Sequence, residues 1–240
     1  MKPILVTGGT GTLGRAVTAA LTAAELPFRV LSRRPGHVVA DLVTGQGLTA
    51  ALSDVDTVLH LATTLRGRRD VIATQNLVSA GPGVRHLVFV SIVGTDRIPI
   101  PYYKGKLAAE RLVARRPHTI LRTTQFHDLV RTLLAGAARL PVMPLPAIRV
   151  QPVDVRDVAT RLVDLARDEP RGRVDDFGGP EVLPLDTLAT EYLHATDRHR
   201  PRVRFTLPGK TFRGYRDGAN LAPPDNPRGT ITFAEYLAAS

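Results

Sequence analysis

The sequence has no cysteine. Its absence excludes a disulfide framework, a thiolate metal site and a cysteine nucleophile. Long apolar runs are also missing, since none approaches the roughly 20 residues that span a bilayer. The apolar run within "MKPILVTGG", residues 1–9, is too short for the core of a signal peptide. We therefore expect a bacterial, cytoplasmic protein that neither enters a membrane nor is exported.

Aromatic residues make up only 5% of the chain, and acidic residues are outnumbered, with 22 Asp and Glu against 32 Lys and Arg. A net charge of +10 favours an anionic partner such as nucleic acid, a membrane surface or a phosphate-bearing cofactor. The arginine-rich segments 66–69 and 198–204 are not interleaved with aromatic residues that stack on bases. We interpret them as solvated loops and do not expect nucleic-acid binding.

Several catalytic signatures are missing. No G-x-S-x-G elbow surrounds Ser91, and "PGKT", residues 208–211, lacks the upstream glycine and strand of a phosphate-binding P-loop. The seven histidines show no metal-ligand spacing and have no carboxylate cluster beside them. We therefore expect neither a serine hydrolase nor a metal site.

The chain does contain a regular alternation of apolar and helical segments. Short runs rich in Val, Ile and Leu occupy residues 4–8, 28–33, 38–42, 57–62, 86–92 and 118–124, and helical spacing appears at 13–25 and 69–81. Continuous apolar strands alternating with helices indicate strands that are covered on both faces. This pattern predicts an α/β fold with a Rossmann-type doubly wound parallel sheet.

Prolines become frequent beyond residue 125, and one regular helix returns at 153–169, where an Asp can cap it. With 240 residues and 43% hydrophobic content, we expect a single domain over 1–240. The predicted nucleotide-binding core covers 1–125 and 150–168. The predicted small C-terminal substrate cap covers 126–149 and 170–240, over the carboxyl ends of the strands, where ligands bind in such sheets.

Three glycines follow the first predicted strand at intervals of three, Gly8, Gly11 and Gly14, and a helical segment begins behind them. This arrangement suits a tight turn, close approach of the backbone to a diphosphate, and the positive end of a helix. It predicts a dinucleotide site; the alternative is a glycine-rich turn without a ligand.

Arg33 and Arg34 follow the second strand, where an acid would pair with the ribose of NAD. A guanidinium grips a phosphate in two places, so we predict NADP, with NADPH favoured over NADH. Arg33 is the expected phosphate ligand, and Arg34 is expected near adenine. The predicted cofactor-binding residues are Thr7, Gly8, Thr10, Gly11, Thr12, Leu13, Gly14, Arg33, Arg34, Asp41, Leu42, Ala62, Thr63, Lys106 and Thr124. For Asp41 the alternative is a turn or cap residue.

The segments "TGGTGTLGR", "SIVG", "YYKGKLAAE", "RTTQFH" and "VQPVDVRDVA" together resemble the atypical short-chain dehydrogenase/reductase superfamily, in its NmrA-like NAD(P)H-binding branch. The resemblance extends over nearly the whole chain. It implies a catalytic set of Ser91, Tyr102 and Lys106. In such a set the tyrosine donates a proton to the substrate oxygen, the serine hydrogen-bonds that oxygen, and the lysine holds the nicotinamide ribose.

The four-residue interval places Tyr102 and Lys106 on one face of a helix, and Pro101 suits its start. Two features depart from the superfamily: the loop between Ser91 and Tyr102 is short, and Gly105 interrupts the helix. That glycine could admit the cofactor or substrate close to the backbone. Two alternatives stay open: Tyr102 only packs while Lys106 binds the ribose, or the segment is merely the start of a surface helix.

Further residues are expected around the substrate: Val93, Gly94, Tyr103, Gln125, Phe126 and His127. A lone histidine such as His127 is more often structural than catalytic. The expected function is an NADPH-dependent, ketoreductase-like oxidoreductase that reduces a carbonyl, quinone or enone of a small-to-medium organic substrate. The alternatives are a non-catalytic NADP-binding redox sensor or regulatory protein, and a redox-neutral isomerase or dehydratase. We expect a monomer or a homodimer.

Overall fold

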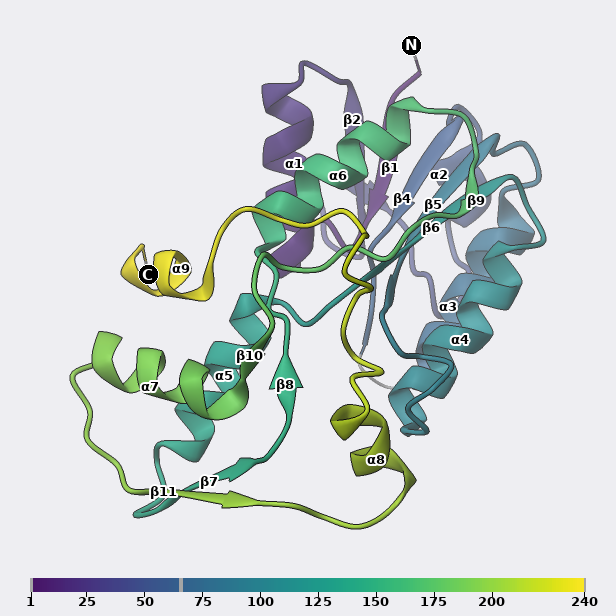
Figure 1. Ribbon diagram of the computed structural model, residues 1–240. Coiled ribbons are helices and arrows are strands. Elements are labelled where there is room, and N and C mark those ends of the chain that lie inside the picture. The colour runs from purple at the N-terminus through teal and green to yellow at the C-terminus, as the bar shows by residue number, and fades with distance from the viewer. Residues whose placement is uncertain (1, 65–66, 240) are drawn as a thin grey trace.

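The computed structural model describes residues 2–64 and 67–239, and in this part of the chain seven strands form one parallel sheet (Figure 1). Their order is β3-β2-β1-β4-β5-β6-β9. The strands are β1 (Ile4–Thr7), β2 (Phe28–Ser32), β3 (Val38–Val39), β4 (Thr57–His60), β5 (His86–Ile92), β6 (His118–Thr123) and β9 (Gly172–Arg173). The order reverses direction between β1 and β4, and the carboxyl ends of such strands are where open α/β sheets bind ligands. The predicted Rossmann-type sheet is confirmed.

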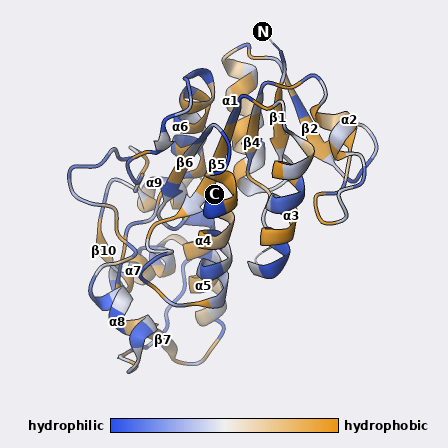
Figure 2. Ribbon diagram, turned by 90° about the vertical axis from the view of Figure 1, so that its right-hand side faces the viewer, coloured by the Kyte–Doolittle hydropathy of each residue, from blue (hydrophilic) through white to orange (hydrophobic). Residues whose placement is uncertain are grey.

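Helices cover both faces of the sheet. One hydrophobic core joins the strands to α1 (Thr12–Ala23) and α6 (Val155–Arg167), and a second joins them to α2 (Leu48–Leu52), α3 (Gly67–Ala80) and α4 (Pro101–Val113). Alternate residues of β5 enter opposite cores, with Val88 in the first and Phe89 in the second. Burial on both sides explains why the strands are continuous apolar runs. Figure 2 shows β4 and β5 as mostly hydrophobic, whereas α3 alternates between hydrophobic and hydrophilic bands.

The later part of the chain forms a separate layer beyond the carboxyl ends of the strands (Figure 1). It contains α5 (His127–Ala137), β7 (Met143–Pro146), β8 (Arg149–Val150), β10 (Leu183–Pro184), α7 (Leu185–Ala195), β11 (Arg202–Phe205), α8 (Lys210–Arg216) and α9 (Phe233–Ala238). Strand β10 pairs antiparallel with β8, and β11 pairs parallel with β7. A third core, with Leu134, Met143, Leu188 and Phe233 fully buried, holds this layer together.

Two details refine the predicted boundaries. Asp154 caps α6 as expected, because its carboxylate accepts from the Arg156 backbone N–H at 2.8 Å. Strand β9, by contrast, comes from residues predicted for the cap, yet it pairs with β6 and extends the core sheet. The segment Gly172–Arg173 is too short to show an apolar or alternating pattern, so the sequence does not predict this strand. In the part of the chain that the structure describes, no helix is long and apolar enough to cross a membrane.

Candidate functional site

The loop after β1 is built from glycines that have no room for a side chain. Gly8 has φ of 72°, and a Cβ on it would lie 2.7 Å from the Ala62 Cα. A Cβ on Gly14 would overlap the carbonyl of Gly8. The loop therefore lies against the end of β4, and α1 packs directly on the loop. Glycine is required here by close backbone packing as well as by conformation.

The first turn of α1 is open to an anion. Gly11 is its N-cap and supplies no side-chain cap, and the first turn holds no acidic residue. Thr10, Gly11 and Thr12 are exposed, and Arg15 Nη1 closes the loop by donating to the Thr10 carbonyl at 2.8 Å. Uncapped N–H groups at the positive end of a helix fit a diphosphate. The donor set of this loop therefore fits a dinucleotide.

The predicted adenosine-side residues lie beside this loop. Arg33 and Arg34 are exposed directly after β2, whose strand pairs with β1. Asp41 Oδ1 accepts from the backbone N–H of Val43 at 2.7 Å and of Thr44 at 3.3 Å, which makes it a turn residue in this structure. Leu42 is half-buried, and its carbonyl accepts from Asn76 Nδ2 at 3.0 Å.

A buried polar chain crosses the ends of β1 and β4. His60 is 1% exposed; its Nδ1 lies 2.7 Å from Thr7 Oγ1, and its Nε2 lies 3.0 Å from Thr74 Oγ1. Thr7 Oγ1 also accepts from the Ala62 N–H at 3.3 Å. Burial, helped by the charge of Lys106, lowers the pKa of His60 to about 3, so its ring is neutral at physiological pH. The hydroxyl of Thr7, a predicted cofactor-binding residue, thus forms hydrogen bonds with His60 and Ala62 at the end of β4.

The hydroxyl of Tyr102 lies beside Thr63, with Tyr102 Oη 3.1 Å from Thr63 Oγ1. Thr63 Oγ1 also donates to Asp70 Oδ2 at 2.6 Å, and the other oxygen of Asp70 accepts from the Thr64 N–H and Oγ1, each at 2.7 Å. Asp70 is only 4% exposed, in the first turn of α3. Burial raises the pKa of Tyr102 above its usual range, and the charge of Asp70 adds to the rise.

Lys106 lies one turn further along α4 and is buried. Its Nζ donates to the Val90 carbonyl at 3.1 Å and lies 4.7 Å from the centre of the Phe89 ring. Burial lowers the pKa of Lys106 to about 8, and the charges of Asp70 and Glu110 oppose that drop. This ammonium is therefore bound to β5, next to Ser91 in the same strand.

Ser91 has a buried hydroxyl that lacks a partner among the described residues. Thr124 Oγ1, at the end of β6, is also buried without a partner there. Buried hydroxyls are normally hydrogen-bonded, and such exceptions occur where a ligand supplies the missing partner. These two hydroxyls lie at the carboxyl ends of neighbouring strands, where a nicotinamide and its substrate would bind.

The predicted substrate residues divide into two groups. Gln125 and Phe126 are half-buried, whereas Val93, Gly94, Tyr103 and His127 are buried. A Cβ on Gly94 would overlap the Ala219 carbonyl, so the segment after α8 covers it. The His127 ring is 0% exposed, lies 3.0 Å from the Ile231 carbonyl and packs against the rings of Phe233 and Tyr236. In this structure it ties α5 to the C-terminal segment.

Three residues near the site were not singled out from the sequence. Asp70 lies in the helical segment 69–81, His60 lies in the apolar run 57–62, and Tyr215 lies beyond both arginine-rich segments. Tyr215 belongs to α8 and packs in a small cluster with Tyr102, Tyr103 and Ile98. Their roles depend on contacts between distant segments, which composition and periodicity do not report.

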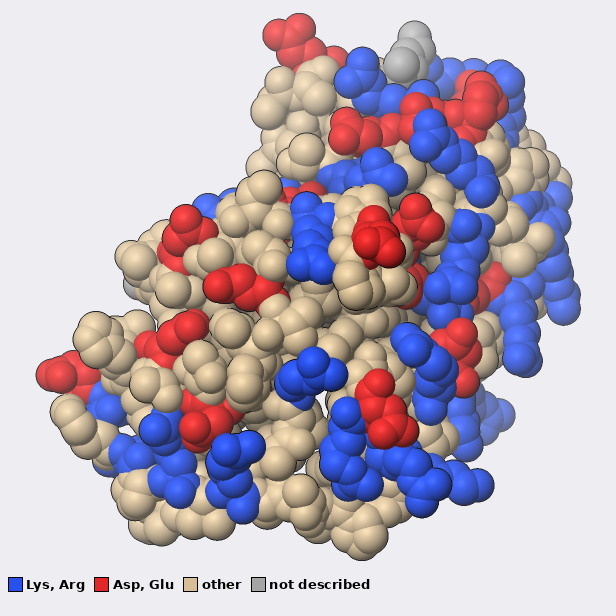
Figure 3. All heavy atoms as spheres, viewed as in Figure 1, with Lys and Arg blue, Asp and Glu red and all other residues tan. Residues whose placement is uncertain are grey.

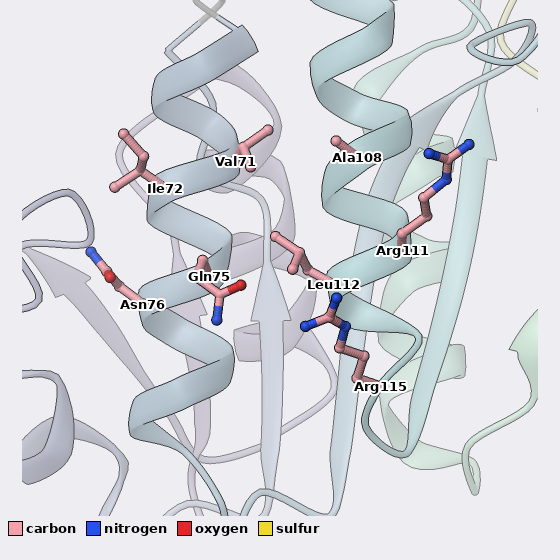
Figure 4. A pocket seen from close by; sticks show the side chains of 8 residues that line it. All are labelled: Val71, Ile72, Gln75, Asn76, Ala108, Arg111, Leu112 and Arg115. Carbon is pink, nitrogen blue, oxygen red and sulfur yellow. The ribbon is translucent and has the colours of Figure 1, made fainter.

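A cavity of about 520 Å³ lies elsewhere, between the outer sides of α3 and α4 (Figure 4). It is lined by Val71, Ile72, Gln75, Asn76, Ala108, Arg111, Leu112 and Arg115, and none of these is a predicted site residue. On the face seen in Figure 3, Lys and Arg are spread from the sheet to the cap with Asp and Glu between them. Across residues 2–64 and 67–239, no three His, Asp or Glu side chains are grouped as ligands for a metal ion.

Comparison with known proteins gives a matching family and two curated reductases. The model of the NmrA-like family matches residues 1–115. An NAD(P)H azoreductase of Xenophilus azovorans is 25% identical, with 98% of this chain and 97% of the relative covered. A (4-alkanoyl-5-oxo-2,5-dihydrofuran-3-yl)methyl phosphate reductase of Streptomyces griseus is 30% identical, with 75% of this chain and 69% of the relative covered.

Solved structures share the fold over almost the whole chain. An NADPH-dependent quinone oxidoreductase from Escherichia coli in complex with NADPH has a TM-score of 0.83 and 19% identity, covering 98% of this chain and 99% of that one. A short-chain dehydrogenase/reductase superfamily protein from Agrobacterium tumefaciens with bound NAD has a TM-score of 0.75 and 23% identity, covering 98% and 95%. The glycine loop, the parallel sheet and these relatives agree, and the chain belongs to the NmrA-like family.

Proposed function

We propose that this protein reduces a carbonyl, quinone or enone of a small-to-medium organic substrate with NADPH, and that Tyr102 is the proton donor. Both curated relatives are reductases, and one of them is an NAD(P)H azoreductase, in agreement with the broader class of NAD(P)-dependent oxidoreductases. The observation that carries the proposal is the buried hydroxyl of Ser91, which lacks a partner among the described residues and follows directly on Val90, whose carbonyl accepts from the Lys106 ammonium.

When bound, NADPH supplies the hydride. The glycine loop would hold its diphosphate at the first turn of α1, and Arg33 and Arg34 would hold the additional phosphate. Ser91 Oγ would donate to the substrate oxygen, on which negative charge develops as the hydride reaches carbon. The O–H bond of Tyr102 would break as its proton passes to that oxygen, leaving a phenolate and a neutral alcohol.

The test follows the absorbance of reduced nicotinamide while purified protein is mixed with NADPH and a panel of quinones, ketones and enones. Turnover that falls at least tenfold in Tyr102→Phe, with NADPH affinity unchanged, supports the proposal. Full turnover in Tyr102→Phe would remove Tyr102 as the donor while leaving the enzyme class intact. Tyr103→Phe is the matched control, because its hydroxyl is assigned no proton transfer.

A second candidate function is an NADP-binding redox sensor or regulatory protein. This function is favoured by the position of the Lys106 ammonium, which donates to the Val90 carbonyl, whereas a catalytic lysine would hold the nicotinamide ribose. Tight NADPH binding without oxidation by any member of the panel would support it. A redox-neutral isomerase or dehydratase would instead convert substrate with no net change in the nicotinamide absorbance.

A further inference from the structure

The Tyr102 hydroxyl is one end of a chain of three side chains from three segments. Tyr102 begins α4, Thr63 follows β4, and Asp70 lies in the first turn of α3. The distances are 3.1 Å from Tyr102 Oη to Thr63 Oγ1 and 2.6 Å from Thr63 Oγ1 to Asp70 Oδ2. Thr64 donates twice to the other oxygen of Asp70.

The single proton of the Thr63 hydroxyl fixes the direction of the two hydrogen bonds that Thr63 makes with Asp70 and Tyr102. A threonine hydroxyl has one proton and accepts through its lone pairs. Thr63 donates that proton to the Asp70 carboxylate, which can only accept while ionised. In the Thr63–Tyr102 contact, Tyr102 must therefore be the donor, and its phenolic proton points toward Thr63.

We propose that Asp70 and Thr63 are positioning residues that hold Tyr102 as a protonated phenol, with Asp70 taking the Thr63 proton so that Thr63 accepts from Tyr102. The inference rests on the proposed role of Tyr102 as proton donor. Once Tyr102 has given its proton to the substrate oxygen, the phenolate and the Asp70 carboxylate compete for the single Thr63 proton. Because Asp70 holds that proton, both Asp70 and the Thr63 oxygen that accepts from Tyr102 favour the neutral phenol.

The charge of Asp70 raises the pKa of Tyr102, in agreement with this geometry. A hydrogen bond donated by Thr63 would lower that pKa, but the Thr63 proton is directed to the Asp70 carboxylate. The other groups around Tyr102 are Tyr103 and Lys106 on its own helix and Tyr215 of α8.

Asp70 also raises the pKa of Lys106. Its effect on Lys106 must therefore be separated from its effect on Tyr102. Lys106 is faced by His60 of β4, by the Phe89 ring of β5 and by Glu110 of α4. Substitution of Asp70 therefore also changes the charge on Lys106 near pH 8, so the test must detect the phenol directly.

The experiment measures ionisation of Tyr102 by difference absorbance of its phenolate, with Tyr102→Phe as the blank, in the complex with NADP⁺. Asp70→Asn should lower the pKa of Tyr102 by about one unit, and Thr63→Val, which removes the acceptor of the phenolic proton, should also lower it. Thr63→Ser keeps the hydroxyl and should restore the wild-type titration. Thr64→Val, which removes a donor to Asp70 but not the Thr63 contact, should leave the titration unchanged.

The pH profile of NADPH oxidation gives the second readout. A proton donor loses activity as pH rises through its pKa, so the alkaline limb should move to lower pH in both Asp70→Asn and Thr63→Val. A shift to higher pH in Thr63→Val, or no shift, overturns the proposal, and the comparison of Thr63→Val with Thr63→Ser tests it if Asp70→Asn fails to fold. A protein that binds NADP⁺ but turns over no substrate refutes the reductase alone, and the titration still tests the chain.

Discussion

Gly67 and Gly105 bring the backbones of α3 and α4 into direct contact. A Cβ built on Gly105 would lie 2.5 Å from the Gly67 Cα and 2.8 Å from its carbonyl oxygen. The glycine that interrupts the helical pattern between Tyr102 and Lys106 therefore serves helix packing in this structure. The contact lies beside the first turn of α3, which carries Asp70, and so helps to hold that carboxylate near the residues proposed for catalysis.

Gly105→Ala should lower the free energy of unfolding by about 1–3 kcal/mol, because the new methyl group must push two backbones apart. The matched control is Gly136→Ala in α5, where nothing lies within 4 Å of the added Cβ. That change should stabilise the protein by up to about 1 kcal/mol, since alanine is the better helix former. Chemical denaturation measures both. Equal stability of Gly105→Ala and wild type would show that the helices separate without cost.

Glu110 should be needed to keep α4 on the sheet. It accepts from Arg122 Nε at 2.9 Å and from Nη2 at 2.7 Å, with both side chains largely buried. Among the described residues, Glu110→Ala leaves the guanidinium with Asp96 as its acidic partner, and the change should destabilise the protein by about 3 kcal/mol.

The control for Glu110 is the exposed ion pair between Arg171 and Asp168, in which the side chains are 53% and 39% exposed. Asp168→Ala should cost less than about 1 kcal/mol, because solvent screens the pair. A cost for Glu110→Ala as small as that of the control would contradict the structural role of the buried pair.

The burial of Lys106 should make stability depend on pH. Its folded pKa of about 8 lies below the usual 10.5, so above pH 8 the unfolded chain binds more protons than the folded protein. The contribution of Lys106 to the free energy of unfolding therefore rises between pH 8 and about 10.5 and does not change with pH below 8. Compared between pH 7 and 9.5 without cofactor, wild type should gain stability relative to Lys106→Met. A pH-independent difference would mean that Lys106 titrates normally.

Arg33 should distinguish the two nicotinamide cofactors. Arg33→Ala should weaken NADPH binding at least tenfold, about 1.4 kcal/mol, and leave NADH binding unchanged, because only NADPH carries the additional phosphate. Arg29→Ala is the control, since Arg29 lies at the other end of β2 beside Asp54. Fluorescence titration of both cofactors gives the affinities. Equal losses for NADPH and NADH would overturn the assignment of Arg33 to the phosphate.

Local pattern in the sequence was enough to determine the fold class and the position of the glycine loop behind β1. The run 86–92 became β5 with the same bounds, because a strand buried on both faces must be apolar throughout. Gly8, Gly11 and Gly14 were identified by their spacing behind β1, since a tight turn at a helix start needs small residues. The membership of Tyr102 and Lys106 in one helix likewise follows from an interval of four.

Only the tertiary structure decided which side chains meet the proposed catalytic residues. The Tyr102 hydroxyl bonds to Thr63 and through it to Asp70, Lys106 bonds to the Val90 carbonyl, and Gly105 packs on Gly67. These partners come from separate strands and helices, and their distances depend on how α3 and α4 pack on the sheet. Periodicity reports the face on which a residue lies, whereas the identity of the atom opposite depends on the packing of all the elements together.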